Sequence, residues 1–163
     1  MPESKLLIKP AVKSLSWLRK IGYKKPLGNS LIRYGIKIKN IDTKPFSGAT
    51  IKNISISSAE GKTAHLTSEK EFKVETLNPD EEILIWFEDT FIPFSGLVFI
   101  NLELDGKDKI LACQWDRGNK SPSKGDANKW SDIVIISDEN ILQQKTTNAL
   151  LVILTILTIL FKI

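Results

Sequence analysis

The sequence has very few of the residues from which catalytic and metal sites are built. It contains one histidine, His65, and one cysteine, Cys113, among 163 residues. Ser-His-Asp catalysis and zinc binding need histidine or cysteine together with further partners, so a single chain lacks their parts. The glycines also do not form the Gly-Lys-Ser or Gly-Lys-Thr loop that holds phosphate groups. We therefore expect a protein that is not an enzyme and that binds no cofactor or metal.

The sequence also lacks the usual marks of an exported protein. A lone cysteine cannot form an intrachain disulfide, and no uninterrupted apolar stretch of the kind found in signal peptides is present near the N-terminus. Lys9, Pro10 and Lys13 break up the apolar residues there. We expect no cleavable export signal.

Positive charge is concentrated at one end of the chain. The net charge is +4, yet residues 1–25 carry seven lysines and arginines against one acid, so the remainder is slightly acidic. A nucleic-acid-binding domain is expected to spread its basic residues over a folded face. The confinement of the excess to one end makes nucleic acid an unlikely partner on sequence grounds.

The length of the chain fits one domain with terminal segments. We predict a basic segment over residues 1–29, a β-sandwich over 30–137 and a C-terminal helix over 138–163. Two interpretations of the basic segment stay open. In one, Leu15 and Leu18 begin the stripe of a short interfacial helix. In the other, the segment is a first strand or arm packed on the domain.

The central part of the chain has the two-residue period of β-strands. Ile36 and Ile38 alternate with lysines, which is typical of a half-buried strand. Ile51 and Ile54 can share a face only with a one-residue slip, which a bulge near Asn53 would supply. Seven or eight short strands without a long amphipathic helix between them predict an all-β, immunoglobulin-like sandwich.

Part of this region resembles a known family. The segments Gly35–Asn40, Ala49–Asn53, Leu77–Glu82 and Phe94–Asp105 are similar to CARDB-type immunoglobulin-like modules of bacterial and archaeal surface proteins. The resemblance covers about residues 31–105. It implies a β-sandwich and a surface location, and it carries no catalytic residues.

One long polar loop is a candidate for recognition. It runs from residue 116 to residue 130, and loops of this kind on a rigid scaffold often carry binding residues. Two tryptophans flank it, and they either form an exposed aromatic contact or anchor its ends in the core. The candidate recognition residues are Arg117, Lys120, Lys124, Lys129 and Trp130.

The C-terminal segment is strongly apolar. Thirteen residues from 149 to 161 contain no charge, and threonines 155 and 158 are their only polar members. As a helix they span about 20 Å, less than the roughly 30 Å of a bilayer core, so spanning requires terminal lysines to snorkel. Asp138 is a plausible N-cap, which predicts a helix from Glu139. The predicted anchor residues are Ala149, Leu150, Leu151, Val152, Ile153, Leu154, Ile156, Leu157, Ile159, Leu160 and Phe161.

These features predict a non-enzymatic, membrane-tethered binding or structural module whose helix contacts lipid. With no export signal, we expect a single-pass C-terminal anchor and a domain on the cytoplasmic side, with a protein partner or a second copy as further possibilities. The alternative is a soluble, self-assembling structural protein in which the apolar helices pack against one another.

Overall fold

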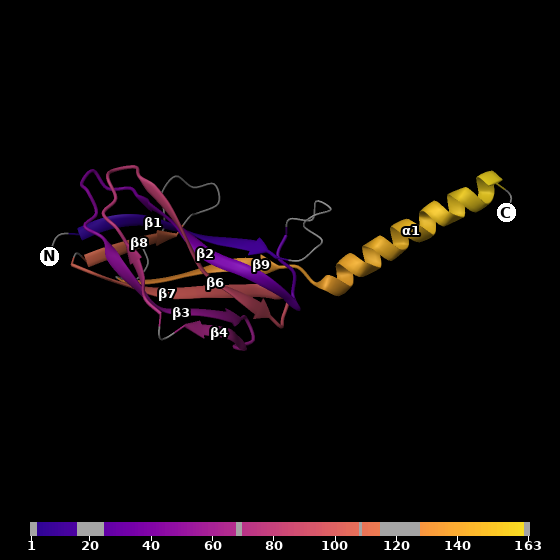
Figure 1. The fold of residues 1–163 in the computed structure, drawn as a ribbon, viewed down its shortest axis with the longest axis horizontal. Coiled ribbons are helices and arrows are strands. Elements are labelled where there is room, and N and C mark those ends of the chain that lie inside the picture. Colours follow the sequence, from indigo (N-terminus) through magenta and orange to yellow (C-terminus); the bar gives the residue numbers. More distant parts are fainter. Residues whose placement is uncertain (1–2, 16–24, 68–69, 108, 115–127, 162–163) are drawn as a thin grey trace.

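The computed structural model describes residues 3–15, 25–67, 70–107, 109–114 and 128–161. Within these residues, nine strands form two sheets, and one helix projects from one end of them (Figure 1). The elements are β1 (Glu3–Ser14), β2 (Ser30–Asn40), β3 (Ala49–Ser58), β4 (Thr63–Thr67), β5 (Phe72–Val74), β6 (Glu82–Ile92), β7 (Gly96–Gly106), β8 (Lys109–Gln114), β9 (Lys129–Ile136) and α1 (Glu139–Phe161).

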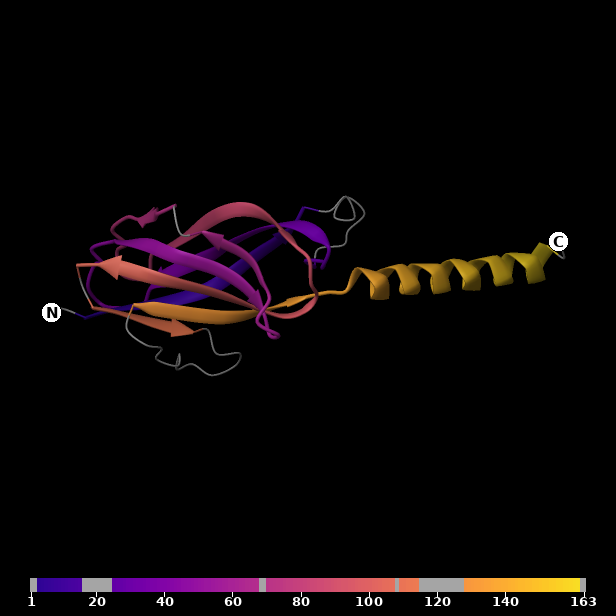
Figure 2. The ribbon, with the colours of Figure 1, turned by 90° about the horizontal axis from the view of Figure 1, so that it is seen from below.

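The two sheets pack face to face as a sandwich (Figure 2). Their strand orders are β6-β2-β1-β8 and β4-β3-β7-β9, and β5 pairs with β3 beside β4. The strands can be given the letters used for immunoglobulin domains: β1 is A, β2 is B, β3 is C, β4 is C′, β6 is E, β7 is F and β9 is G. One sheet then has the order E-B-A, and the other has the order C′-C-F-G. This is the arrangement of immunoglobulin-like sandwiches, with β8 added beside β1. The predicted all-β sandwich with a C-terminal helix is confirmed.

The core forms where alternate side chains of the two sheets meet. Ile36 and Ile38 of β2 are fully buried, while Lys37 and Lys39, which follow them in turn, stay partly exposed. Tyr34 and Phe72 both pack edge-on against Phe87, with ring centroids 5.4 and 4.9 Å away. Such aromatic pairs contribute about 0.5–1.5 kcal/mol beyond their buried area.

Strand β1 belongs to the sandwich. The sandwich therefore includes residues from Glu3 onward, whereas the sequence analysis predicted that it begins at Ser30. β1 pairs antiparallel with β2 and parallel with β8, so it lies inside its sheet. Leu6 and Ile8 are fully buried between the sheets. The alternative of a first strand is correct for residues 3–14, and the helical stripe through Leu18 falls in 16–24, outside the described residues.

Two bulges adjust the strands so that apolar residues keep facing the core. Lys52 pairs with Glu103 and Ser55 with Asn101, so β3 has one extra residue where Asn53 takes a positive φ of 52°. The bulge predicted near Asn53 is confirmed. The second bulge lies in β6, opposite Gly35.

Gly35 is required by this second bulge. A Cβ atom at this position would lie 2.1 Å from the backbone oxygen of Ile85, well inside van der Waals contact. Only a residue without a side chain lets β2 and β6 approach so closely.

Asn40 joins three segments at the end of β2. Its side chain is fully buried, and its Nδ2 donates to the carbonyls of Lys44 and Leu77, both at 2.9 Å. Its Oδ1 accepts from the backbone N–H of Asp42 at 3.0 Å, and its own backbone N–H donates to Glu81. One side chain thus satisfies three backbone groups of two loops.

Replacing this side chain should destabilise the whole sandwich. We expect Asn40→Ala to lower the free energy of unfolding by about 2–4 kcal/mol, because it leaves backbone groups without partners. Urea unfolding of the full-length protein in mild detergent, followed by tryptophan fluorescence, measures this. The control is Asn101→Ala, which removes one 3.3 Å hydrogen bond to Ser55. Equal effects of the two substitutions would contradict the role of Asn40.

Candidate functional site

The described residues include two of the five predicted recognition residues. Arg117, Lys120 and Lys124 lie outside the described residues. Lys129 is exposed at the start of β9, with its Nζ 3.7 Å from a carboxylate oxygen of Glu103. Trp130 does not belong to a binding surface, because it is a core residue with 3% exposure. Its inward position on β9 makes it an anchor, which is the second of the two alternatives given above for the flanking tryptophans.

A basic face lies on the outer side of the four-stranded sheet. We define it by the outward residues of β1 and β2, and like charges face each other across these strands in the pairs Lys9–Lys37 and Lys13–Arg33. Like charges directly opposite each other destabilise a strand pair. Carboxylates of β6 offset this repulsion. The residues of the basic face are Lys5, Lys9, Lys13, Arg33, Lys37 and Lys39.

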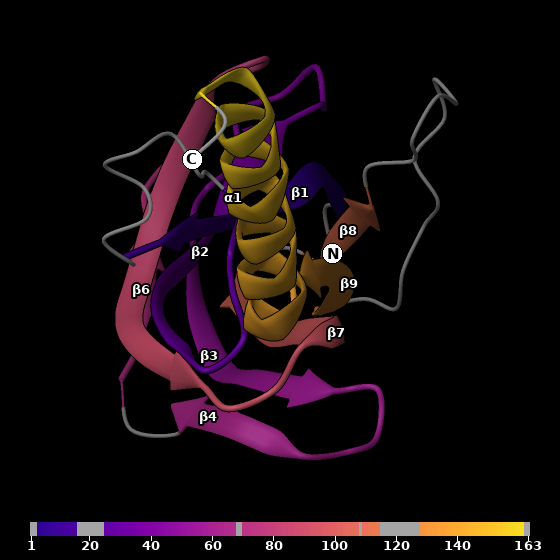
Figure 3. The same cartoon turned by 90° about the vertical axis from the view of Figure 1, so that its right-hand side faces the viewer.

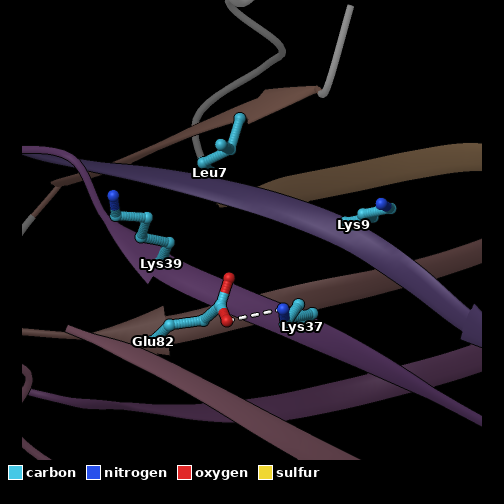
Figure 4. Close-up of a pocket in the computed structure, with 5 residues that line it drawn as sticks. All are labelled: Leu7, Lys9, Lys37, Lys39 and Glu82. Carbon is cyan, nitrogen blue, oxygen red and sulfur yellow. Dashed lines mark ion pairs between the residues drawn. The ribbon is translucent and has the colours of Figure 1, made fainter. Parts of the chain in front are cut away.

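The basic face contains a shallow hollow of about 60 Å³ (Figure 4). Leu7 forms its apolar part, and lysines from β1 and β2 surround it with Glu82. Lys37 Nζ lies 2.5 Å from a carboxylate oxygen of Glu82, and Lys39 Nζ lies 2.8 Å from one of Asp80. Because these two lysines already have acidic partners, the hollow is a poor site for a free anion.

Farther along the same face, Arg33 and Asp89 form a two-pronged ion pair. Arg33 donates from Nε to Oδ1 at 2.6 Å and from Nη2 to Oδ2 at 3.0 Å. The hydrogen bond from Arg33 is the main cause that lowers the pKa of Asp89. Burial opposes it, and the positive charges of Arg33 and Lys13 make smaller contributions in the lowering direction. The pair links β2 to β6 on the solvent side.

No cluster of three or more histidine, cysteine, aspartate or glutamate residues able to hold a metal occurs among the described residues. Arg33, Lys37 and Lys39 of the basic face are paired with the carboxylates of Asp89, Glu82 and Asp80. Among the described residues, α1 carries a large apolar surface that is not buried.

Helix α1 begins with a well-formed cap. Asp138 Oδ1 accepts from the backbone N–H of Asn140 at 2.8 Å, as an N-cap side chain does. Glu139 follows in the first turn, where a negative charge stabilises the helix dipole. The predicted cap and start of the helix are confirmed.

The apolar segment of α1 is not buried against the sandwich. The segment Gln143–Phe161 has 19 residues, a mean hydropathy of 1.5 and no buried share, and it is long and apolar enough to cross a membrane. At about 1.5 Å per residue it is roughly 28 Å long, close to the thickness of a bilayer core. Its large apolar residues are all exposed. Figures 1 and 2 show the helix extending away from the end of the sandwich, and Figure 3 looks onto this end with the helix in front of the strands.

The two polar residues within the apolar run 149–161 are satisfied inside the helix. Thr155 Oγ1 donates to the carbonyl of Leu151 at 2.8 Å, and Thr158 Oγ1 donates to that of Leu154 at 2.9 Å. Threonine hydroxyls bonded in this way leave no free donor. The part of the helix from residue 149 to residue 161 therefore presents a surface that is compatible with hydrocarbon on every side.

The junction between sandwich and helix is short and fixed. β9 ends at Ile136 and α1 begins at Glu139. Between them, the backbone N–H of Ser137 donates to the carbonyl of Pro26 at 2.9 Å, and Gly28 donates to the carbonyl of Ser137 at 2.8 Å. These bonds hold the chain to the sandwich until one residue before the helix cap.

Comparison with known proteins finds distant likenesses to solved structures. No family model and no curated protein matches the chain. The crystal structure of a hemolymph-type prophenoloxidase from a crustacean is similar over 83% of this chain and 30% of that chain, with 11% sequence identity and a TM-score of 0.32. A likeness at this level supports no argument about function. The resemblance to CARDB-type modules stays a prediction.

The Arg33–Asp89 pair makes a pH-dependent contribution to stability. Because the folded-state pKa of Asp89 is lowered from 3.8, the pair stabilises the fold above about pH 4, and this contribution is lost as the pH falls further. We expect Asp89→Asn to reduce stability at pH 7 and to have a smaller effect at pH 3. Urea unfolding at the two pH values measures the difference.

A matched background separates this pair from other titrating groups. In an Arg33→Met variant, Asp89→Asn should have little effect at either pH, because the partner is already missing. An equal loss of stability at pH 7 and pH 3 in the wild-type background would show that the carboxylate charge is not what stabilises.

Proposed function

We propose that this protein is a membrane-anchored β-sandwich, held in the bilayer by α1, whose folded domain binds or supports other molecules without catalysing a reaction. The observation that carries the proposal is the exposure of large apolar residues on all sides of α1. Burying such a side chain contributes about 1.5–3 kcal/mol, so covering the helix is worth on the order of ten kcal/mol or more. The sandwich itself covers none of it.

The length and ends of the helix support a membrane as the covering medium. The 19-residue segment Gln143–Phe161 is about as long as the hydrocarbon core is thick when its polar residues 143–148 are counted together with the apolar run 149–161. Lys145 lies near its start, where a long side chain can extend to the headgroups. The side of the membrane on which the sandwich lies stays a prediction.

A bundle of α1 helices from several copies is the second candidate function. The same side chains would be covered by helix packing in water, in a soluble assembly. This candidate differs from the first in where the protein is found, because the bundle needs no lipid.

Extraction of membranes tests the first candidate directly. We expect the full-length protein to stay with membranes in alkaline carbonate and to be released by detergent. Val152→Asp with Ile156→Lys should abolish this behaviour, since each charge at the centre of a span costs about 2.5–3.5 kcal/mol. These two residues are one helical turn apart, so the charges can pair without breaking the helix.

A matched variant controls for the substitutions themselves. Val152→Leu with Ile156→Leu keeps the helix apolar and should behave as the wild type does. A wild-type protein that stays soluble without membranes and sediments as a discrete oligomer would reject the anchor and establish the bundle. Protection from added protease in sealed vesicles then determines the side of the domain.

A further inference from the structure

Exposed apolar residues occur on the outer faces of both sheets: Leu31, Leu84 and Phe91 on the four-stranded sheet, and a group joined across β7 and β9 on the five-stranded sheet. At the ends of β7 and β9 next to α1, Leu97, Ile133 and Ile135 point outward with exposures of 50%, 43% and 57%. Phe99 lies beside them and is partly exposed. The residues are joined by the cross-strand pairs Leu97–Ile135 and Phe99–Ile133. We call these four residues the β7/β9 patch.

The remainder of this outer face is polar and balanced in charge. Lys52 Nζ lies 2.9 Å from a carboxylate oxygen of Asp105 and 3.4 Å from one of Glu71. Lys129 is paired with Glu103. A second copy of the same face therefore meets no excess of like charge. The opposite side of the sandwich carries the basic face, which would repel its own copy.

The size of the β7/β9 patch sets the strength of any contact that it makes. Four partly exposed apolar residues make a patch on the order of 300 Å². A stable interface in solution needs about 800 Å² from each partner. The patch is too small to hold two free molecules together, but a weak contact suffices when both partners are already concentrated on one surface.

The position of the patch allows two copies to share one membrane. The patch lies on a side of the sandwich, and α1 leaves the sandwich at the adjacent end (Figure 1). Two copies that meet through such a side can be related by a two-fold axis along the length of the molecule. In that arrangement both α1 helices leave in the same direction and enter the same bilayer.

We propose that two anchored copies of this chain associate side by side through the β7/β9 patch, which is an inference that rests on the proposed membrane anchoring. The contact forms between chains that α1 holds in one membrane and is lost when they are diluted in detergent. The second copy covers Ile133 and Ile135. A bilayer lying across the end of the sandwich would not cover these residues, because they lie on its side.

Cysteine cross-linking in membranes tests the contact. Full-length Ile135→Cys in a Cys113→Ala background is reconstituted into vesicles and treated with a short bifunctional maleimide. We expect a cross-linked dimer with a yield several-fold higher than that of Leu84→Cys, a position on the opposite sheet that is 45% exposed against 57% for Ile135. Adding Ile133→Lys to the Ile135→Cys variant should reduce the dimer several-fold, because it places like charges in the contact.

The outcomes separate this inference from the anchoring on which it rests. Carbonate extraction of the same samples shows whether the chain is membrane-embedded. Embedded protein with equal yields at positions 135 and 84 reflects random collision, and it overturns the dimer while leaving the anchor intact. Yields that do not change with Ile133→Lys also overturn it. Absence from the carbonate-resistant fraction overturns the anchor and, with it, a dimer that depends on the membrane.

Discussion

The sandwich depends on one inward row of side chains along β2. Ile32, Tyr34, Ile36 and Ile38 are all buried between the sheets, and β2 is the strand that joins β1 to β6. Burying four such residues contributes about 6–12 kcal/mol, which is comparable to the whole stability of a small domain. A slip of one residue would turn the row toward water. Asn40, at the end of the row, fixes the register by bonding to two loops at once.

The outer faces of the two sheets are organised in different ways around this common core. On the four-stranded sheet, like charges of β1 and β2 oppose each other and are held by carboxylates from β6. On the five-stranded sheet, charges cancel locally and apolar residues gather toward the helix. The outer face of the four-stranded sheet therefore carries an excess of positive charge, whereas the ion pairs described on the outer face of the five-stranded sheet balance its charges locally.

The sequence was informative where the signal is local. Three features can each be recognised from a few neighbouring residues: the alternation in β2, the bulge at Asn53 and the helix cap at Asp138. Each has the expected structure. The place of β1 could not be found in this way, because its parallel partner β8 lies about a hundred residues away. Trp130 was placed in the candidate recognition loop because the sequence does not show where that loop ends and β9 begins. Its position in β9 is what turns its side chain inward. The β7/β9 patch looks like ordinary strand sequence until the pairing shows which side of the sheet its residues occupy.

The fixed junction at Ser137 has a mechanical consequence. A force that pulls α1 away from the domain passes directly into β9, whose eight residues pair with β7 from Gly96–Ile136 to Glu103–Lys129. The pull runs along the strand, so these pairs are loaded together in shear and cannot open one after another like a zipper. The bonds of Ser137 to Pro26 and Gly28 share that load with the start of β2. The domain is thus built to resist extraction at the point where tension would enter it.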